Sequence, residues 1–145
     1  MYKILRRTFG TTASVCLALS VRGFAMSAEA QQLPHQGQTA RDLYLADCSA
    51  CHQAGGEGLR GLFPPLKGSG VVNKADPAKH IQVVLHGMQG ARAGGVVYAT
   101  AMPPFISALS DAEIADIINY ERSSWGNHGA LVTPARVAAE RSRRK

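Results

Sequence analysis

The sequence predicts an all-α fold, a small helical bundle that forms one domain. Three observations predict it. Apolar residues recur at helical spacing in three segments, glycine and proline fill the long connections between these segments, and no segment alternates apolar and polar residues as a strand would. The 145 residues of the chain are enough for one small domain and not comfortably for two.

Residues 1–30 look like an export signal rather than part of that domain. They contain a basic start with Lys3 and Arg6, a mostly apolar run over residues 8–21, and a small-x-small sequence at residues 28–30. We therefore expect a mature, periplasmic protein that begins near Gln31. The apolar run is shorter than the roughly 20 residues that span a bilayer, and an uncleaved anchor is the minority alternative.

Two further features of this segment bear on the mature chain. The sequence RRTF at residues 6–9 also resembles the start of a twin-arginine signal, which serves proteins exported already folded. Cys16 lies within the signal and would leave with it. The mature protein then has two cysteines, Cys48 and Cys51.

The net charge of +6 belongs mainly to the two ends of the chain. Removal of residues 1–30 leaves twelve basic and nine acidic residues, and five of these basic residues lie in residues 136–145. The body lacks the basic stripe that nucleic-acid binding needs, so we expect no nucleic-acid partner. We expect residues 129–145 to form a solvated basic tail. The alternative is that the tail docks to an acidic partner or to anionic lipid, with membrane contact at most peripheral.

The first helix of the domain is expected over residues 38–50, after a loose lead-in at residues 31–37. Leu43, Tyr44 and Leu45 are available for its inward face, and it ends at the cysteine pair. The next stretch, residues 54–70, contains six glycines and Pro64-Pro65, so we expect a loop. Because this loop also carries several large apolar residues, it must cover something hydrophobic.

The second helix begins at Asp76-Pro77, a capping side chain followed by a proline at the first helical position, and ends at Gly87. Residues 87–100 contain four glycines and are expected to form another loop, followed by two prolines at residues 103–104. The third helix begins with a capping box between Ser110 and Glu113 and closes near residues 125–126. Three modest helices with only four phenylalanines in the chain make a small core, which a large apolar prosthetic group would complete.

The sequence Cys48-Ser49-Ala50-Cys51-His52 allows three chemistries: a redox dithiol, half of a zinc site, or the attachment of haem. A structural disulfide does not explain the pair, because so short a loop would stabilise little. A redox dithiol of the thioredoxin type needs a preceding strand that is missing here. A zinc site needs four ligands, and no second pair exists. His80 and His86 are six residues apart, which turns them about 240° from each other on a helix.

The remaining chemistry is covalent attachment of haem. Cys-x-x-Cys-His is the attachment signal of c-type haem, in which the two thiols bind the vinyl groups of the porphyrin. The adjoining histidine, His52, then supplies the proximal ligand of the iron. A backbone carbonyl in the loop FPPL, residues 63–66, is the natural acceptor for the other ring nitrogen of His52.

The second axial position decides what the iron does, because an open position allows oxygen or peroxide chemistry and a second ligand gives an electron carrier. Met102 precedes Pro103 and Pro104, which stiffen its loop, so we predict Met102 as the ligand. Met88 lies in a glycine-rich stretch and is expected to be a loop or packing residue. Four histidines remain as competitors: His35, His80, His86 and His128.

With these features the chain resembles class I c-type cytochromes over residues 38–128. The matching segments are LYLADCSACH at 43–52, FPPLKGS at 63–69, AMPPF at 101–105 and LSDAEIADIINYERSSWG at 109–126. More narrowly, FPPLKGSGVVN, VVLHG and NYERSSWGN are similar to the cytochrome subunits of periplasmic alcohol, sugar-acid and aldehyde dehydrogenases.

The resemblance implies a cytochrome c fold, a small helical bundle wrapped around one covalently bound haem c, with its first and last helices crossing. Applied to this sequence, it implies thioether links at Cys48 and Cys51, and it implies axial ligands at His52 and Met102. It also matches Pro64 and Leu66 to a Pro-x-Leu loop, so the carbonyl of Pro64 is the expected partner of His52. Those dehydrogenase subunits commonly carry three haem domains, whereas this chain has one motif.

The sequence therefore predicts an electron-transfer protein with no catalysis of its own. Its expected partners are a periplasmic dehydrogenase as electron donor and a cytochrome or oxidase of the respiratory chain as acceptor. One alternative is a haem enzyme or a gas or peroxide sensor with an open iron site. Another is a small haem subunit inside a dehydrogenase complex. The oligomeric state and the substrate of any associated enzyme do not follow from the sequence.

Overall fold

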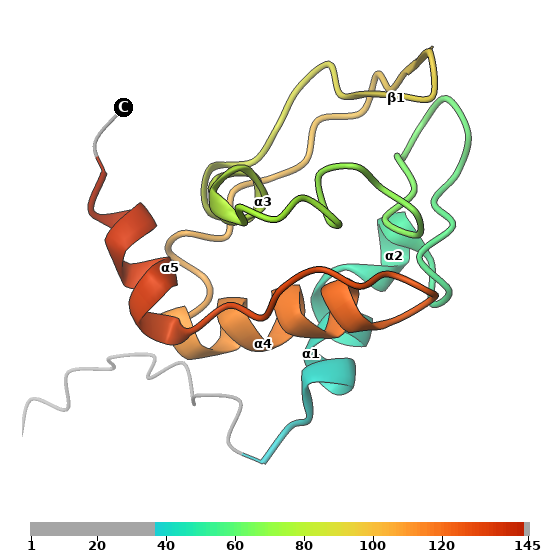
Figure 1. Cartoon of the computed structure of the whole chain (residues 1–145). Coiled ribbons are helices and arrows are strands. Elements are labelled where there is room, and N and C mark those ends of the chain that lie inside the picture. The colour runs from blue at the N-terminus through green and yellow to red at the C-terminus, as the bar shows by residue number, and fades with distance from the viewer. Residues whose placement is uncertain (1–36, 144–145) are drawn as a thin grey trace, which may run out of the picture. The chain divides into compact units, whose positions relative to one another are not determined.

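A computed structural model describes residues 37–143 of the chain, and Figure 1 shows how their elements are arranged. The expectations for the export signal, the cleavage site, Cys16 and His35 lie outside these residues. The described part is mainly helical, as predicted. Its helices are α1 (Ala40–Asp47), α2 (Ser49–His52), α3 (Ala78–His86), α4 (Asp111–Ser123) and α5 (Pro134–Arg141), and its strands are β1 (Arg92–Ala93) and β2 (Val96–Val97).

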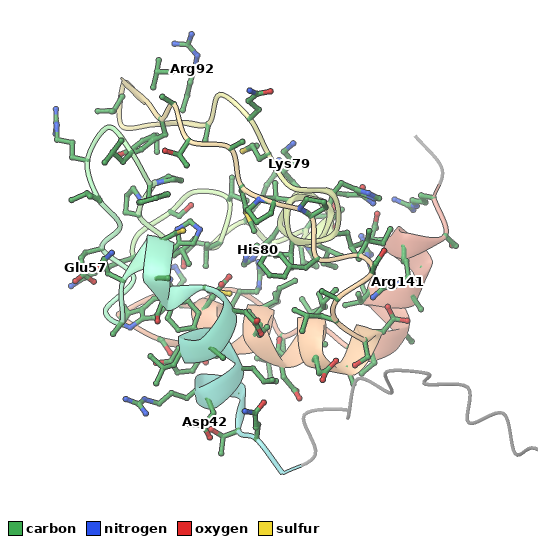
Figure 2. All side chains as sticks on the ribbon, turned by 180° about the vertical axis from the view of Figure 1, so that it is seen from behind. Asp42, Glu57, Lys79, His80, Arg92 and Arg141 are labelled. Carbon is green, nitrogen blue, oxygen red and sulfur yellow. The ribbon has the colours of Figure 1, made fainter. Side chains whose placement is uncertain are left out.

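Helix α1 begins at a capping box. The Thr39 hydroxyl accepts a hydrogen bond from the Asp42 amide at 3.2 Å, and the Asp42 carboxylate accepts one from the Thr39 amide at 3.1 Å. Asp42 lies at the outer end of the helix (Figure 2). On the inner face, Leu43 and Tyr44 are buried where α1 crosses α4 (Figure 1). The crossing of the first helix with α4 is as the family resemblance implied.

Helices α3 and α4 begin at the signals that the sequence predicted. The Asp76 carboxylate accepts a hydrogen bond from the Ala78 amide at 3.1 Å, and α3 ends at Gly87 with a φ of 73°. At α4, Ser110 and Glu113 form the expected reciprocal capping box. The starts of both helices and the end of α3 therefore lie close to the predicted capping residues, whereas α4 ends at Ser123, before the expected residues 125–126.

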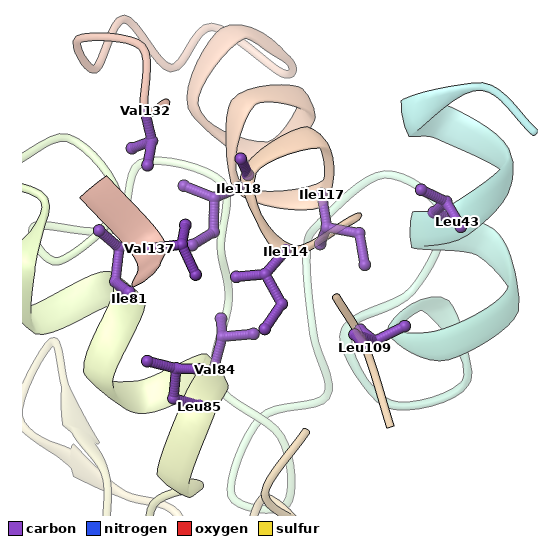
Figure 3. Close-up of a cluster of buried hydrophobic side chains, with 11 residues drawn as sticks. Leu43, Ile81, Val84, Leu85, Leu109, Ile114, Ile117, Ile118, Val132 and Val137 are labelled. Carbon is purple, nitrogen blue, oxygen red and sulfur yellow. The ribbon is translucent and has the colours of Figure 1, made fainter. Parts of the chain in front are cut away.

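The hydrophobic core lies between α4 and the helices around it (Figure 3). Ile114, Ile117 and Ile118 of α4 are fully buried at the centre. Each side chain of this size contributes about 1.5–3 kcal/mol when it leaves water. Helix α4 also supplies Ala115, and the surrounding elements supply the remaining buried members: Leu43, Ile81, Val84, Leu85, Leu109, Val132 and Val137.

Two features differ from the prediction. The expected solvated tail is wrong for residues 134–141, which form α5 and pack against α3 and α4. The Thr133 hydroxyl caps this helix, Pro134 occupies its first turn, and Val137 is fully buried. In addition, the glycine-rich loop after α3 contains the two-residue hairpin of β1 and β2, in which Arg92 pairs with Val97. This hairpin is too short to produce an alternating pattern in the sequence.

Candidate functional site

The cysteine pair lies at the junction of α1 and α2. Cys48 caps α1 through its amide, which donates to the Tyr44 carbonyl at 2.9 Å, and the His52 amide donates to the Cys48 carbonyl at 2.9 Å. The two cysteines are thus one helical turn apart, on neighbouring positions of the helix surface. Both thiols are free and partly buried. Burial, followed by the charges of Glu121 and Asp47, raises the pKa of the Cys48 thiol above its ordinary value.

His52 is held by the loop that follows it. Its ring Nδ1 lies 2.9 Å from the Pro64 carbonyl oxygen, so Nδ1 carries the proton and donates. This tautomer leaves the lone pair of Nε2 free to bind a metal. The Gly58 amide donates to the His52 carbonyl at 2.9 Å, which ties the loop to the histidine by a second bond. The side chain is buried, with 9% of its surface exposed.

Asn127 is the residue that fixes this loop from the other side, and sequence reasoning missed it. Its amide nitrogen donates to the carbonyls of Leu66 at 3.1 Å and Glu121 at 2.8 Å. Its carbonyl oxygen accepts from the Gly68 amide at 2.9 Å and from the Asn73 side chain at 2.8 Å. All four bonding positions of this buried amide are therefore used. Three of the four partners, Leu66, Gly68 and Asn73, lie 54 to 61 residues away along the chain, so no local sequence signal could have shown these contacts.

Met102 and Met88 lie side by side. Their backbones form an antiparallel bridge, in which the Met102 amide donates to Met88 at 2.8 Å and the Met88 amide donates to Met102 at 3.2 Å. Gly87 fits closely beneath this bridge, because a Cβ added there would lie 2.3 Å from the Met102 carbonyl oxygen. Two methionines are therefore available on this side of the site, where the sequence predicted one.

One cavity is lined both by the segment of His52 and by the bridge of Met88 and Met102. Its lining includes all six residues that the sequence singled out, namely Cys48, Cys51, His52, Pro64, Leu66 and Met102, and Met88 as well. Apolar side chains supply much of the rest: Phe63, Val71, Val72, Val83, Val84, Phe105, Leu109 and Ile117. Of the competing histidines in the described residues, His80 lines the cavity, whereas His86 and His128 do not.

The donor set of this cavity fits a c-type haem. Two free thiols one helical turn apart, an imidazole with an engaged Nδ1, two methionines in the lining of the same cavity and apolar walls suit covalent attachment and iron ligation. Within residues 37–143, no group of three or more His, Cys, Asp or Glu side chains is arranged to hold a metal ion. The fold and the cavity define the class of protein, a c-type cytochrome domain.

The comparisons with known proteins give the family. Residues 35–120 match the family model described as cytochrome c oxidase, cbb3-type, subunit III, and the chain belongs to this family of c-type cytochromes. Membership confirms the predicted cofactor, covalently bound haem c, and the predicted role in electron transfer. When bound, haem c supplies a one-electron couple at its iron.

Three curated relatives are similar to this chain. The cytochrome c subunit of the quinone alcohol dehydrogenase of Gluconobacter oxydans is 40% identical over 93 residues, which are 64% of this chain and 20% of the relative. The cytochrome c subunit of gluconate 2-dehydrogenase of Pantoea cypripedii is 37% identical over 72% of this chain and 24% of its own length. Cytochrome c-554(548) of Halomonas halodenitrificans is 34% identical over 54% of this chain and 86% of its own length.

The match to the two dehydrogenase subunits spans about a fifth to a quarter of their length. The match to the Halomonas cytochrome spans most of that small protein. Within the described residues, no helix is long and apolar enough to cross a membrane.

Proposed function

We propose that this protein is a monohaem electron carrier whose iron is bound by His52 and Met102. One observation carries the proposal: residues from three separate segments, the cysteine pair with its histidine, the loop of Pro64 and Leu66, and Met102, line one largely apolar cavity. Cys48 and Cys51 would form the thioether links, and Pro64 would orient His52 through the 2.9 Å contact with Nδ1. The apolar walls would exclude water from the site.

Met102 is the proposed second axial ligand. Its position between the bridge to Met88 and the two following prolines restricts its backbone, as a fixed ligand needs. A thioether is a soft ligand that favours the ferrous state and raises the reduction potential. Met88 serves as a matched comparison, because it lies in the same bridge and lines the same cavity.

Substitution of each methionine by alanine tests this assignment. We expect Met102→Ala to remove the weak sulfur-to-iron charge-transfer band of the oxidised protein and to lower its potential, while Met88→Ala retains the band. The reverse pattern would transfer the ligand role to Met88. If both variants kept the band and the potential, neither methionine would bind the iron, and the alternative of an open or histidine-bound site would take its place.

We further propose that the donor is a dehydrogenase of the periplasm and that the acceptor belongs to the respiratory chain. The support is the similarity to cytochrome subunits of alcohol and gluconate dehydrogenases. Leu59 and Leu62, each about half exposed at 49% and 47%, lie in the loop that also holds Pro64 and offer apolar contact area for such partners. The test is the rate at which a quinoprotein dehydrogenase reduces the oxidised cytochrome with and without its substrate. Equal rates would reject this donor.

A further inference from the structure

The last residue of α5, Arg141, contacts the segment that leads from Met102 to α4. Its Nη1 donates to the Ile106 carbonyl, its Nη2 donates to the Leu109 carbonyl at 2.9 Å, and its Nε donates to the Asp111 carboxylate at 2.7 Å. Figure 2 shows Arg141 between α5 and the segment that leads into α4. One side chain of α5 thus binds three acceptors within a short stretch of chain.

The turn at residues 105–109 is tied to two helix ends. The amides of Phe105 and Ile106 donate at 3.1 Å and 3.0 Å to carbonyls in the last turn of α3. Arg141 adds the tie to the end of α5. Because Phe105 and Leu109 also line the cavity, the position of this turn affects the wall of the haem site.

Arg141 is the nearest side-chain anchor of Met102. No side-chain hydrogen bond reaches residues 99–105 within the described chain, so such support begins at the turn that Arg141 binds. Pro103 and Pro104 lie between Met102 and this turn. Their φ angles are fixed by the proline rings, so this link absorbs little displacement. A shift of the turn is therefore passed on to the methionine.

The guanidinium of Arg141 suits this task better than an ammonium would. It has five N–H donors in one rigid plane, so its three acceptors fix the turn, the start of α4 and the end of α5 relative to one another. Its pair with Asp111 is partly buried, with the two side chains 25% and 32% exposed. Arg136 of the same helix instead pairs with the carboxylates of Asp76 and Glu140, each at 3.0 Å.

We propose that Arg141 is a positioning residue for the axial methionine, which fixes the turn after Met102 and thereby keeps the sulfur on the iron. The inference rests on the ligation given under the proposed function. Helix α5 lies outside residues 35–120, the part of the chain that matches the family model. Loosening of the turn leaves the thioether links at Cys48 and Cys51 intact, so the haem stays attached while the sulfur leaves the iron more often.

The rate at which cyanide binds the oxidised, haem-loaded full chain tests the proposal. Cyanide enters when the methionine has left the iron, so at low cyanide concentration the rate reports the fraction of protein with an open position. Arg141→Gln should raise this rate about tenfold, because the loss of one charge-assisted hydrogen bond changes an equilibrium by at least about this factor. Its reduction potential should fall, since the ferrous state loses its soft ligand more often.

Arg136→Gln is the matched control. It removes the same charge from the same helix and breaks the pairs with Asp76 and Glu140, but it leaves the contacts of Arg141 in place. Its cyanide rate should stay within about twofold of the wild type, since exposed ion pairs contribute little. Denaturant unfolding is measured on both variants. A merely structural role of Arg141 would lower the unfolding midpoint of Arg141→Gln without changing its cyanide rate.

Two outcomes overturn the proposal: a wild-type cyanide rate in Arg141→Gln, or an equal rise in Arg136→Gln. If Arg141→Gln does not load haem, Arg141→Lys decides. A lysine keeps the charge near Asp111 but lacks the planar fork that binds both carbonyls, so the cyanide rate should still rise, and a wild-type rate rejects the proposal.

The charge-transfer band reports the ligation itself. A band that is absent from the wild type, or that persists in Met102→Ala, rejects the proposed ligation and this inference with it. A band that is present in the wild type and lost in Met102→Ala, together with an unchanged cyanide rate in Arg141→Gln, rejects the role of Arg141 alone.

Discussion

The two sides of the haem cavity are built differently. On the His52 side, side chains from distant elements hold the loop, since Asn127 binds Leu66 and Gly68 while Pro64 accepts from the histidine. On the Met102 side, main-chain bonds do this work, and no side-chain hydrogen bond reaches residues 99–105 within the described part of the chain. The difference indicates that the histidine is fixed by the whole fold. Met102, the proposed second ligand, is held by the backbone bridge to Met88, and the Phe105 amide after it donates to the Val84 carbonyl at 3.1 Å. Because side-chain hydrogen bonds do not support this loop in the described chain, local changes can move it more easily.

The largest effect is expected at Asn127. Asn127→Leu keeps the size of the side chain but leaves two carbonyls, one amide and the Asn73 side chain without their partner. The free energy of unfolding should fall by roughly 3–5 kcal/mol, since each buried group left unpaired costs about 1–3 kcal/mol. Denaturant unfolding of the haem-loaded protein measures this loss.

A second asparagine of the same region provides the control. Asn119 makes two hydrogen bonds to the backbone of Val132 and holds the segment before α5, away from the loop of Pro64. Asn119→Leu should also destabilise, by about 1–3 kcal/mol, but should leave the potential unchanged. Asn127→Leu should raise the potential, because a histidine that bonds its carbonyl less well is a weaker donor to the iron. An equal shift of the reduction potential in both variants would show that Asn127 has no special effect on His52.

Gly58 tests the His52 side where it lies against the loop of Pro64. It has a φ of 64°, and a Cβ there would lie 2.5 Å from the Phe63 carbonyl oxygen and 2.7 Å from the Pro64 carbonyl oxygen, the acceptor of His52. Gly61, with a φ of 82°, has no atom within 4 Å of an added Cβ. Both alanine variants carry the backbone strain of about 1–2 kcal/mol, and Gly58→Ala should lose roughly 1–3 kcal/mol more from overpacking.

The reduction potential should distinguish Gly58→Ala from Gly61→Ala more clearly than the free energy of unfolding does. Displacement of the Pro64 carbonyl in Gly58→Ala should raise the potential, whereas Gly61→Ala should match the wild type. Redox titration at one pH measures both. Identical potentials in the two variants would show that the Pro64 carbonyl does not tune the histidine.

Gly87 is the corresponding test on the Met102 side. With a φ of 73°, it places an added Cβ 2.3 Å from the Met102 carbonyl oxygen, whereas Gly90 has a φ of 65° and open space. Gly87→Ala should cost roughly 2–5 kcal/mol in unfolding free energy, about 1–2 from backbone strain and 1–3 from overpacking, because the backbone of Met102 must move. That movement loosens the methionine, so the potential should fall and added cyanide should bind the oxidised protein faster.

A reduction potential that rises in Gly58→Ala and falls in Gly87→Ala would support the difference between the His52 side and the Met102 side. Gly90→Ala, which carries the strain without the contact, should leave both the potential and the rate of cyanide binding unchanged. Two results would show that Met102 is held as firmly as His52. One is a raised reduction potential in Gly87→Ala. The other is a potential and a rate of cyanide binding that both stay unchanged.

The sequence predicted those parts of the fold that local chemistry determines. Asp76-Pro77, Gly87 and the Ser110–Glu113 box gave the start of α3, its end and the start of α4. Helix α5 was missed although Thr133-Pro134 is the same kind of start signal, because the basic residues around it suggested a solvated tail. Within the site, the attachment motif was readable, since its residues are adjacent in the chain.

Contacts over long sequence distances could not be read in this way. The pair of His80 and Glu121 joins residues 41 positions apart, and Arg122 donates to carbonyls of Val72 and Lys74 about 50 positions away. Each of these residues occupies a helical position that an exposed polar side chain could also occupy. Their burial follows from how α3 and α4 pack, which periodicity alone does not specify.

The smallest effect is expected at the cap of α1, at the other end of the helix from Cys48. Thr39 donates to Asp42 and thereby holds the pKa of this exposed carboxyl below its ordinary value of 3.8. A lowered pKa means that the cap contributes stability above this value and loses it as the pH falls through the lowered pKa in the folded state. Thr39→Ala should destabilise by about 1 kcal/mol at pH 7, and less as the pH falls below 4.

Ser110→Ala at the cap of α4 should cost about the same amount. Neither variant should change the potential, since both caps lie outside the cavity lining. A changed potential in Thr39→Ala alone would show that the His52 side responds to the far end of α1, and that its rigidity extends beyond the loop bound by Asn127.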